Sequence, residues 1–145
     1  MQECGSLGPT LGRCAHLARE RMDARLSRYD VTPAQTHVLM CLHRGGGQMP
    51  QRQLTELLKV RPSTANGILD RMAEKGLVER SISGGDARQK LITLTEKGRA
   101  QHTLLRENFQ AVEDLMVQSL TAEEQAQLRE LLGRVIRNLE EDRTA

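Results

Sequence analysis

The side chains best suited to chemistry lie between Arg61 and Lys90. Within that stretch, the six residues RPSTAN bring a guanidinium, two hydroxyls and an amide together. Guanidinium and hydroxyl groups bind phosphate oxygens, and an asparagine amide pairs with the major-groove edge of adenine. In a helix that enters a major groove, Asn66 could pair with adenine and Ala65 could contact a thymine methyl group. Outside that setting, Ser63 and Thr64 are first-turn residues that bind no ligand. The candidate DNA contacts in this part are Arg61, Pro62, Ser63, Thr64, Asn66 and Arg71.

A second group of charges follows two glycines, Gly84 and Gly85, which permit a sharp turn. We expect Arg88 to enter a minor groove, where a narrow A·T tract concentrates negative potential. Asp86 would orient that guanidinium, and Lys90 would contact a backbone phosphate. The alternative is an exposed Asp–Arg pair that contacts nothing and contributes about 0–1 kcal/mol.

Two short helices and a hairpin are predicted to position these groups. The first of these two short helices lies in QRQLTELLKV, and its residues expected to face inward are Leu54, Leu57 and Leu58. After a tight turn the second helix begins at Pro62 and ends at Gly76, which suits a left-handed stop. Two β-capable runs, residues 78–83 and 89–94, then predict a hairpin. This order of elements is typical of a winged helix-turn-helix.

Longer helices are predicted on both sides of this unit. Apolar residues at three- and four-residue steps indicate a first helix over residues 9–29. Thr32 and Gln35 form a capping box for a second helix, which stops at the glycines of residues 45–47. A short connection through Met49 and Pro50 then leads to the helix-turn-helix.

The C-terminal part predicts two more helices. Thr95 caps one that runs to about residue 120, and Thr121 with Glu124 forms a capping box for the last. The main apolar stripe of the long helix is Leu105, Phe109, Val112 and Met116. The apolar seam of the last helix is Leu128, Leu131, Leu132, Val135, Ile136 and Leu139. Because such faces are hard to bury within one chain, we expect a homodimer, with a folded-back bundle as the alternative.

Composition agrees with a helical protein. The 145 residues suggest one domain, and an aromatic content of 1% leaves a core of Leu, Val, Ile, Ala and Met. No apolar run approaches the roughly 18 residues of a membrane span, and the N-terminus lacks the apolar region of a signal peptide. The three cysteines form no CxxC. We therefore expect a soluble cytoplasmic protein in a reducing environment.

Charge is unevenly distributed along the chain. Residues 59–90 carry a net charge of +3, whereas residues 113–145 carry −4. A basic middle beside an acidic tail is compatible with nucleic-acid binding, but a solvated helix surface gives similar values.

A family resemblance lies in the stretch STANGILDRMAEKGLVERSISGGDARQKLITLTEKG. It resembles the signature of the MarR family of bacterial transcriptional regulators. The matching segments are Ser63-Thr64, Asp70 through Arg80, Asp86-Ala87-Arg88 and Leu94 through Gly98. The TPAQ of residues 32–35 is similar to the family too. The helix lengths and the order of the helices agree with the family from about Leu11 to Leu139.

The resemblance implies a mainly α fold with a small β-hairpin wing. Residues 1–30 and 95–145 would be dimerisation helices, and residues 31–94 a DNA-binding lobe, all within one structural domain. It also implies a homodimeric repressor that binds a pseudo-palindromic operator, responds to a small-molecule effector and needs no cofactor. Gly67 departs from the family, which often has arginine there. This departure implies altered sequence preference, closer backbone approach to DNA or weaker binding.

The regulatory input has several candidate forms. The resemblance implies an effector bound between the terminal helices and the DNA-binding lobe, and candidate lining residues are His16, Arg19, His37 and Met40. A metal is the alternative, because Cys14 with His16 and His37 with Cys41 could supply zinc ligands. Thiol sensing is the third form. The family's peroxide-sensing branch matches poorly, since Cys14 lies about two turns later than the sensor cysteine of that branch and Tyr29 is the single tyrosine, but another thiol mechanism stays open.

Two other classes of protein fit less well. The sequence has no GxSxG, HExxH or GxxxxGK[ST] motif, so we do not expect an enzyme. A winged helix used only for protein interaction predicts an apolar or acidic helix face. The corresponding residues here, including Arg61, Ser63 and Arg88, are polar or basic.

Overall fold

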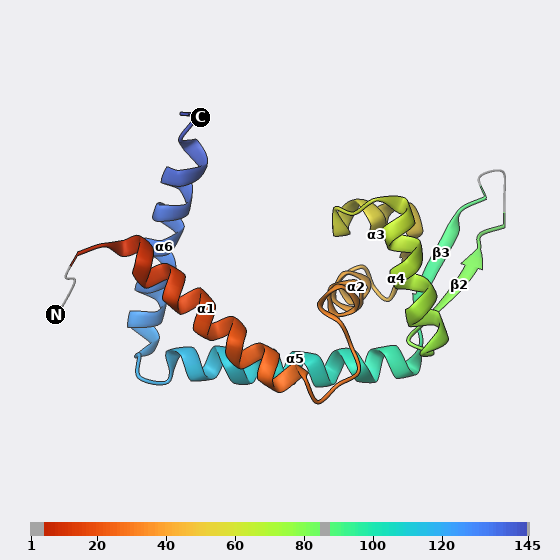
Figure 1. Ribbon diagram of the computed structural model, residues 1–145, viewed down its shortest axis with the longest axis horizontal. Coiled ribbons are helices and arrows are strands. Elements are labelled where there is room, and N and C mark those ends of the chain that lie inside the picture. The colour runs from red at the N-terminus through yellow and green to blue at the C-terminus, as the bar shows by residue number, and fades with distance from the viewer. Residues whose placement is uncertain (1–4, 85–87, 145) are drawn as a thin grey trace.

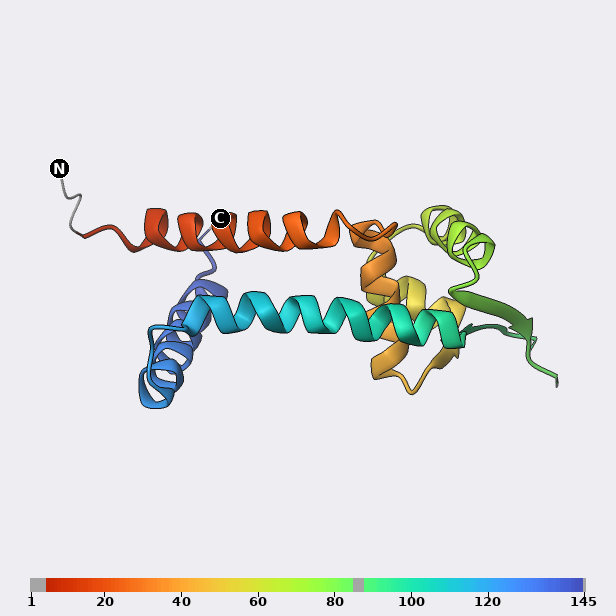
Figure 2. The ribbon, with the colours of Figure 1, turned by 90° about the horizontal axis from the view of Figure 1, so that it is seen from below.

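A computed structural model describes residues 5–84 and 88–144 and shows a lobe at one end of a long helix (Figure 1). The elements in these ranges are α1 (Leu7–Leu26), α2 (Pro33–Arg44), β1 (Gln48–Pro50), α3 (Gln51–Leu58), α4 (Pro62–Glu74), β2 (Val78–Ile82), β3 (Lys90–Leu94), α5 (Glu96–Val117) and α6 (Ala122–Glu141). The lobe holds α2 to α4 and the strands. The long helix α5 leads from the lobe to α6 at the far end (Figure 2).

Three helices begin at the predicted capping residues. The Thr32 hydroxyl accepts a hydrogen bond from the Gln35 N–H at 3.1 Å, and Gln35 Oε1 accepts one from the Thr32 N–H at 3.3 Å. The same reciprocal pair links Thr121 and Glu124, so both capping boxes are confirmed. The Thr95 hydroxyl caps α5 in a similar way. These partners matter because the first four N–H groups of a helix have no acceptor within it.

A third strand joins the predicted hairpin. Strands β2 and β3 pair antiparallel, and β1 pairs with the other edge of β3, giving the order β1-β3-β2. Met49 and Arg80 therefore both lie opposite Ile92. The connection predicted through Met49 and Pro50 is thus a strand. Its three residues are too short to show the alternation that marks a strand in a sequence.

The core lies where α2, α3, α4 and the sheet meet. Its side chains that are 0% exposed include Val38, Leu39, Leu42, Leu54, Leu69, Met72 and Ile92. Leu105 brings α5 into the same cluster. The prediction that Leu57 faces inward is wrong, because this side chain is 47% exposed. In the eight-residue α3, Leu54 and Leu58 at i and i+4 already form the buried face.

The terminal helices leave much of their apolar surface uncovered. Helix α1 packs antiparallel along α5, whereas α6 turns away from α5, and neither α1 nor α6 has a buried residue (Figures 1 and 2). The exposed apolar side chains here include Leu7, Leu17, Leu104, Leu115, Met116, Leu128, Leu131, Ile136 and Leu139. Even so, no helix within residues 5–84 and 88–144 is long and apolar enough to cross a membrane.

Gly98 places the first turn of α5 against the segment between α4 and β2. A Cβ atom at Gly98 would overlap the carbonyl oxygen of Leu77, which belongs to the backbone and cannot rotate away. We expect Gly98→Ala to lower the free energy of unfolding by about 1–3 kcal/mol in urea denaturation.

Gly67→Ala is the matched control for this prediction. A Cβ atom at Gly67 meets nothing within 4 Å, so alanine should raise stability by about 0.5–1 kcal/mol through helix propensity. If Gly98→Ala were as stable as the wild type, the contact with Leu77 would not constrain α5.

Candidate nucleic-acid interface

Four of the nine predicted contact residues lie at the exposed start of α4. Arg61, Pro62, Ser63 and Thr64 are exposed, and no side chain caps the helix at this end. The N–H groups of a first turn have no acceptor within the helix, and the helix dipole makes this end positive. The turn therefore offers hydroxyls, N–H groups and a guanidinium to an anion such as phosphate. Arg71 is exposed further along α4.

Ala65 does not belong to this surface. Its side chain is 0% exposed, so the predicted contact with a thymine methyl group is wrong. The reason is helical phase, because Ala65, Leu69 and Met72 are spaced by four and three residues and form the buried face of α4.

A groove of about 690 Å³ brings α4 and the hairpin together on one surface. Its walls come from α3, the start of α4 and the residues at the start of β3. Among the described residues, the charged side chains that line it are Arg52, Glu56, Lys59, Arg88 and Lys90. Four of these five are basic, so the charge of the groove suits a polyanion such as the DNA backbone.

An amide pair lies in the wall of this groove. Gln51, the first residue of α3, is 9% exposed, and its Nε2 donates a hydrogen bond to Asn66 Oδ1 at 2.5 Å. Asn66 lies on α4 and is half-buried. Gln51 Oε1 is buried and has no hydrogen-bond partner among the described residues. Asn66 therefore lines the groove, and its side-chain amide oxygen is already engaged by the protein.

Arg80 connects the hairpin to α4. Its Nη1 forms an ion pair with the Asp70 carboxylate, and its Nη2 donates a hydrogen bond to the main-chain oxygen of Asn66 at 3.1 Å. The Asp70 side chain is 58% exposed, so solvent screening limits the pair to about 0–1 kcal/mol. Its main consequence is geometric, because it links β2 to the middle of α4.

Arg88 and Lys90 lie on the hairpin side of the groove, and both are exposed. Asp86 lies outside the described residues. The predicted orientation of the Arg88 guanidinium by Asp86 therefore stays a prediction.

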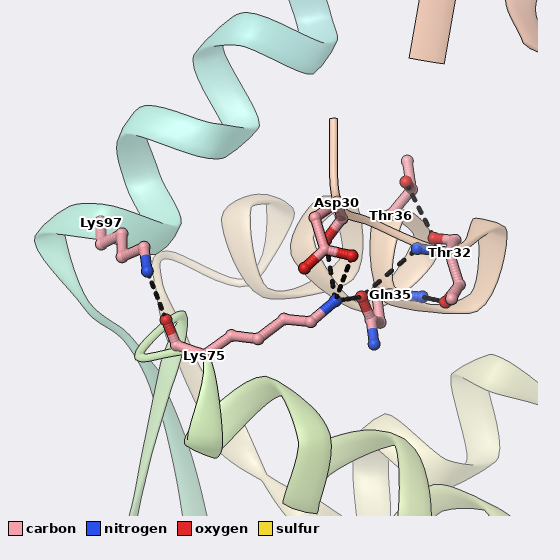
Figure 3. Close-up of polar contacts among 6 residues, drawn as sticks. All are labelled: Asp30, Thr32, Gln35, Thr36, Lys75 and Lys97. Carbon is pink, nitrogen blue, oxygen red and sulfur yellow. Dashed lines mark hydrogen bonds and ion pairs between the residues drawn. The ribbon is translucent and has the colours of Figure 1, made fainter. Parts of the chain in front are cut away.

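Lys75 holds the other end of α4 (Figure 3). Its Nζ donates hydrogen bonds to the main-chain oxygen of Asp30 at 2.8 Å and to Gln35 Oε1 at 3.0 Å. The main-chain oxygen of Lys75 accepts a bond of 2.6 Å from the Nζ of Lys97 on α5. Gly76 follows with a φ of +76°, which confirms the predicted left-handed stop. The end of α4 is thus tied to the α1–α2 connection, to α2 and to α5.

A second cavity, of about 380 Å³, lies between α2 and α5. It is lined by Met40, His43, Arg44, His102, Leu105, Arg106 and Phe109. Of the four predicted effector contacts, Met40 lines it. His16, Arg19 and His37 are exposed and lie outside its lining, so the structure does not bring the four together.

Two histidines stack in the wall of this cavity. The rings of His43 and His102 lie 3.9 Å apart at an angle of 17°. Burial lowers the pKa of His102, and the nearby His43 and Arg106 lower it further. A neutral His102 is therefore favoured, and Arg44 and Arg106 supply the fixed positive charge of the cavity.

The two cysteines within the described residues differ in solvent exposure. Cys14 is exposed, whereas Cys41 is buried in the core. Burial raises the pKa of the Cys41 thiol, with Arg44 opposing, so the reactive thiolate is disfavoured. Across residues 5–84 and 88–144, no cluster of three or more His, Cys, Asp or Glu side chains suits a metal ion.

Known proteins are similar to this chain in sequence and in fold. The family model described as MarR family matches residues 29–89. The HTH-type transcriptional regulator PecS of Dickeya dadantii (strain 3937) is 30% identical over 136 residues, which cover 92% of this chain and 82% of PecS. The chain belongs to the MarR family. MarR-family proteins are DNA-binding transcriptional regulators and not enzymes, in agreement with the interpretation of the sequence.

Solved MarR-family structures match nearly the whole chain. A mutant of MarR from E. coli has 30% identity and a TM-score of 0.72, covering 93% of this chain and 99% of the other. A mutant of MepR from S. aureus has 25% identity and a TM-score of 0.81 with the same coverage. The predicted fold, mainly α with a winged helix-turn-helix, is confirmed. We call α4 the recognition helix and the β2–β3 hairpin the wing.

The contacts of three residues that support the recognition helix, Gln51, Lys75 and Arg80, were not predicted from the sequence. Gln51 meets a partner 15 positions away, and Lys75 meets Gln35 40 positions away, so neither contact has a local signal. Arg80 and Asp70 both lie within the family motif, which therefore marked them without indicating their ion pair.

Proposed function

We propose that this MarR-family regulator acts as a homodimeric repressor on a pseudo-palindromic operator. The observation that carries the proposal is the basic groove, which joins the uncapped start of the recognition helix to the wing residues Arg88 and Lys90. In a dimer the recognition helices enter major grooves of half-sites about one helical turn apart, and the wings follow the adjacent minor grooves. Occupying an operator that overlaps a promoter would exclude RNA polymerase. Such a regulator would act in the cytoplasm of a bacterium.

The proposed dimer is supported by the uncovered apolar surface of α1, α5 and α6. Helix α6 has no buried residue, although its seam includes Leu128, Leu131, Ile136 and Leu139. An apolar surface of this extent gains stability when a second copy covers it. We infer that residues 1–30 and 95–145 form the dimerisation part and residues 31–94 the DNA-binding lobe.

The proposed effector site is the cavity between α2 and α5. Leu105, Phe109 and Met40 supply apolar walls, and Arg44 and Arg106 supply positive charge. This chemistry suits a small organic anion with an apolar body. Because α2 and α5 both hold the end of the recognition helix through Lys75, a ligand that separates them would shift that helix and weaken operator binding.

The effector proposal predicts that ligand binding depends on the positive charge of the cavity. A thermal-shift screen of aromatic and aliphatic carboxylates should find compounds that raise the melting temperature of the wild type. Arg106→Gln should abolish the shift, because it removes a charge from the cavity. A compound that stabilises both proteins equally would place the effector elsewhere.

DNA binding itself predicts a steep dependence on salt. Each phosphate contact releases counterions, so the logarithm of the binding constant should fall with the logarithm of salt by about 0.9 per contact. Arg88→Ala should make this slope shallower and weaken binding most at sites with A·T-rich flanks, as measured by fluorescence anisotropy.

The control for this series is Arg129→Ala on α6. It removes the same charge from an exposed position away from the groove. A wild-type affinity that does not depend on salt, or an Arg88→Ala variant identical to Arg129→Ala, would contradict the proposed interface.

The dimer proposal predicts that a charge added to the apolar face of α6 weakens the dimer, whereas a charge added to the opposite face does not. Leu131→Glu places a charge within the apolar seam, so it should shift the protein toward monomer in sedimentation equilibrium and reduce operator affinity at least tenfold. Ala126→Glu adds the same charge at an exposed position on the opposite face and should leave the dimer intact. Retention of the dimer by Leu131→Glu would move the interface away from α6.

A further inference from the structure

Asn66 and Gln51 form a pair whose chemistry restricts what the recognition helix can read. Gln51 is nine-tenths buried, and its Nε2 holds Asn66 Oδ1 at 2.5 Å. Both residues line the groove that Arg88 and Lys90 complete. An asparagine amide has a single oxygen acceptor and an NH₂ group with two donors. With the oxygen turned toward the buried glutamine, the NH₂ group is the end left for a ligand.

The opposite arrangement of the two amides is less favourable. If both amides were rotated, Asn66 would donate to Gln51, and the buried NH₂ of Gln51 would lose its acceptor. In the observed arrangement, the group without a partner among the described residues is Gln51 Oε1, the oxygen of the side-chain amide. Unpaired buried N–H groups are rarer in proteins than under-satisfied carbonyl oxygens. The observed orientation therefore leaves the less costly group unpaired.

We propose that Gln51 is a positioning residue that makes Asn66 a hydrogen-bond donor to DNA and so sets base preference at one position of the operator. This inference rests on the proposed function. Adenine requires both a donor and an acceptor from the amide, whereas guanine presents two adjacent acceptors, N7 and O6. An outward NH₂ group selects guanine. This replaces the pairing with adenine expected from the residue type alone.

The surroundings of Asn66 support this role. Arg80 bonds to the main-chain oxygen of Asn66 and pairs with Asp70 one turn later, so α4 is held at this residue from the wing side as well. Gly67, the next residue, has no side chain, and the space around its Cα is open. The amide of Asn66 can therefore approach a base edge without a neighbouring side chain in the way.

The test begins by locating the base position that Asn66 reads. Duplexes selected by the wild type from a random pool are compared with those selected by Asn66→Ala. The position at which the alanine variant loses its preference is the one in contact with Asn66. We expect guanine there for the wild type, favoured on the order of fivefold over adenine in competition binding.

Two variants of Gln51 then separate positioning from packing. Gln51→Glu offers only acceptors when ionised, and the neighbouring Arg80 and Lys90 favour that form. It should draw the Asn66 NH₂ inward and turn its oxygen outward, so preference should move from guanine toward bases with an exocyclic amino donor, adenine or cytosine. Gln51→Met has similar volume and no polar group at its end. It should relax the preference to less than about twofold, because neither amide orientation is then imposed.

The outcomes distinguish the inference from the function on which it rests. A changed preference at the Asn66 position, with other positions intact, supports the inference. Equal loss of affinity for all sequences in both Gln51 variants would mean that Gln51 only packs, and would overturn it. A wild-type preference for adenine that depends on Asn66 would overturn it as well. A wild type that enriches no sequence would overturn the proposed function itself. Circular dichroism melting of each variant confirms that the compared proteins are folded.

Discussion

The proposed DNA-binding surface depends on the hydrogen bonds that hold the C-terminal end of the recognition helix. Lys75 bonds to the main-chain oxygen of Asp30 and to the Gln35 side chain, and Lys97 bonds to the main-chain oxygen of Lys75. Just beyond, the Thr95 hydroxyl donates to the main-chain oxygen of Gly76 at 2.5 Å. These bonds join α4 to α2 and α5. Under the proposed mechanism, a change in the spacing of α2 and α5 moves the recognition helix with them.

The opposite end of the recognition helix is left open to solvent. It has no side-chain cap, and its first-turn residues are exposed. This contrast is expected. A surface that binds phosphate needs hydrogen-bond donors that are still unpaired, whereas the groups that fix the position of the helix need hydrogen bonds that are already formed. Arg80 adds a third restraint by linking the wing to the middle of the helix. Each restraint contributes little free energy in solvent, but together they reduce the ordering needed when DNA binds.

The proposed allosteric coupling uses the same bonds. The cavity between α2 and α5 lies between the two helices to which the end of α4 is tied through Gln35 and Lys97. An anion bound between Arg44 and Arg106 would act on both helices at once. Operator and effector would then compete through the relative position of α2 and α5, which is the two-state element that allostery requires.

Local signals in the sequence predicted the helix ends well. Thr32, Thr121 and Gly76 act within a few residues of where they stand, so their caps and turns follow from residue type. Contacts between distant residues could not be predicted in this way. The burial of Ala65, the exposure of Leu57 and the three-residue β1 depend on how helices and strands meet in space. The pairing of Gln51 with Asn66 is of the same kind, and it bears directly on the expected chemistry of the site.

The most direct measurement of the central claim is the symmetry of the DNA that the wild-type chain selects from a random pool of duplexes. Two recognition helices related by a two-fold axis should enrich an inverted repeat with half-site centres about 10–10.5 base pairs apart. Enrichment of a single, unsymmetrical motif, or of no motif at all, would contradict a homodimer that reads DNA through paired recognition helices and wings.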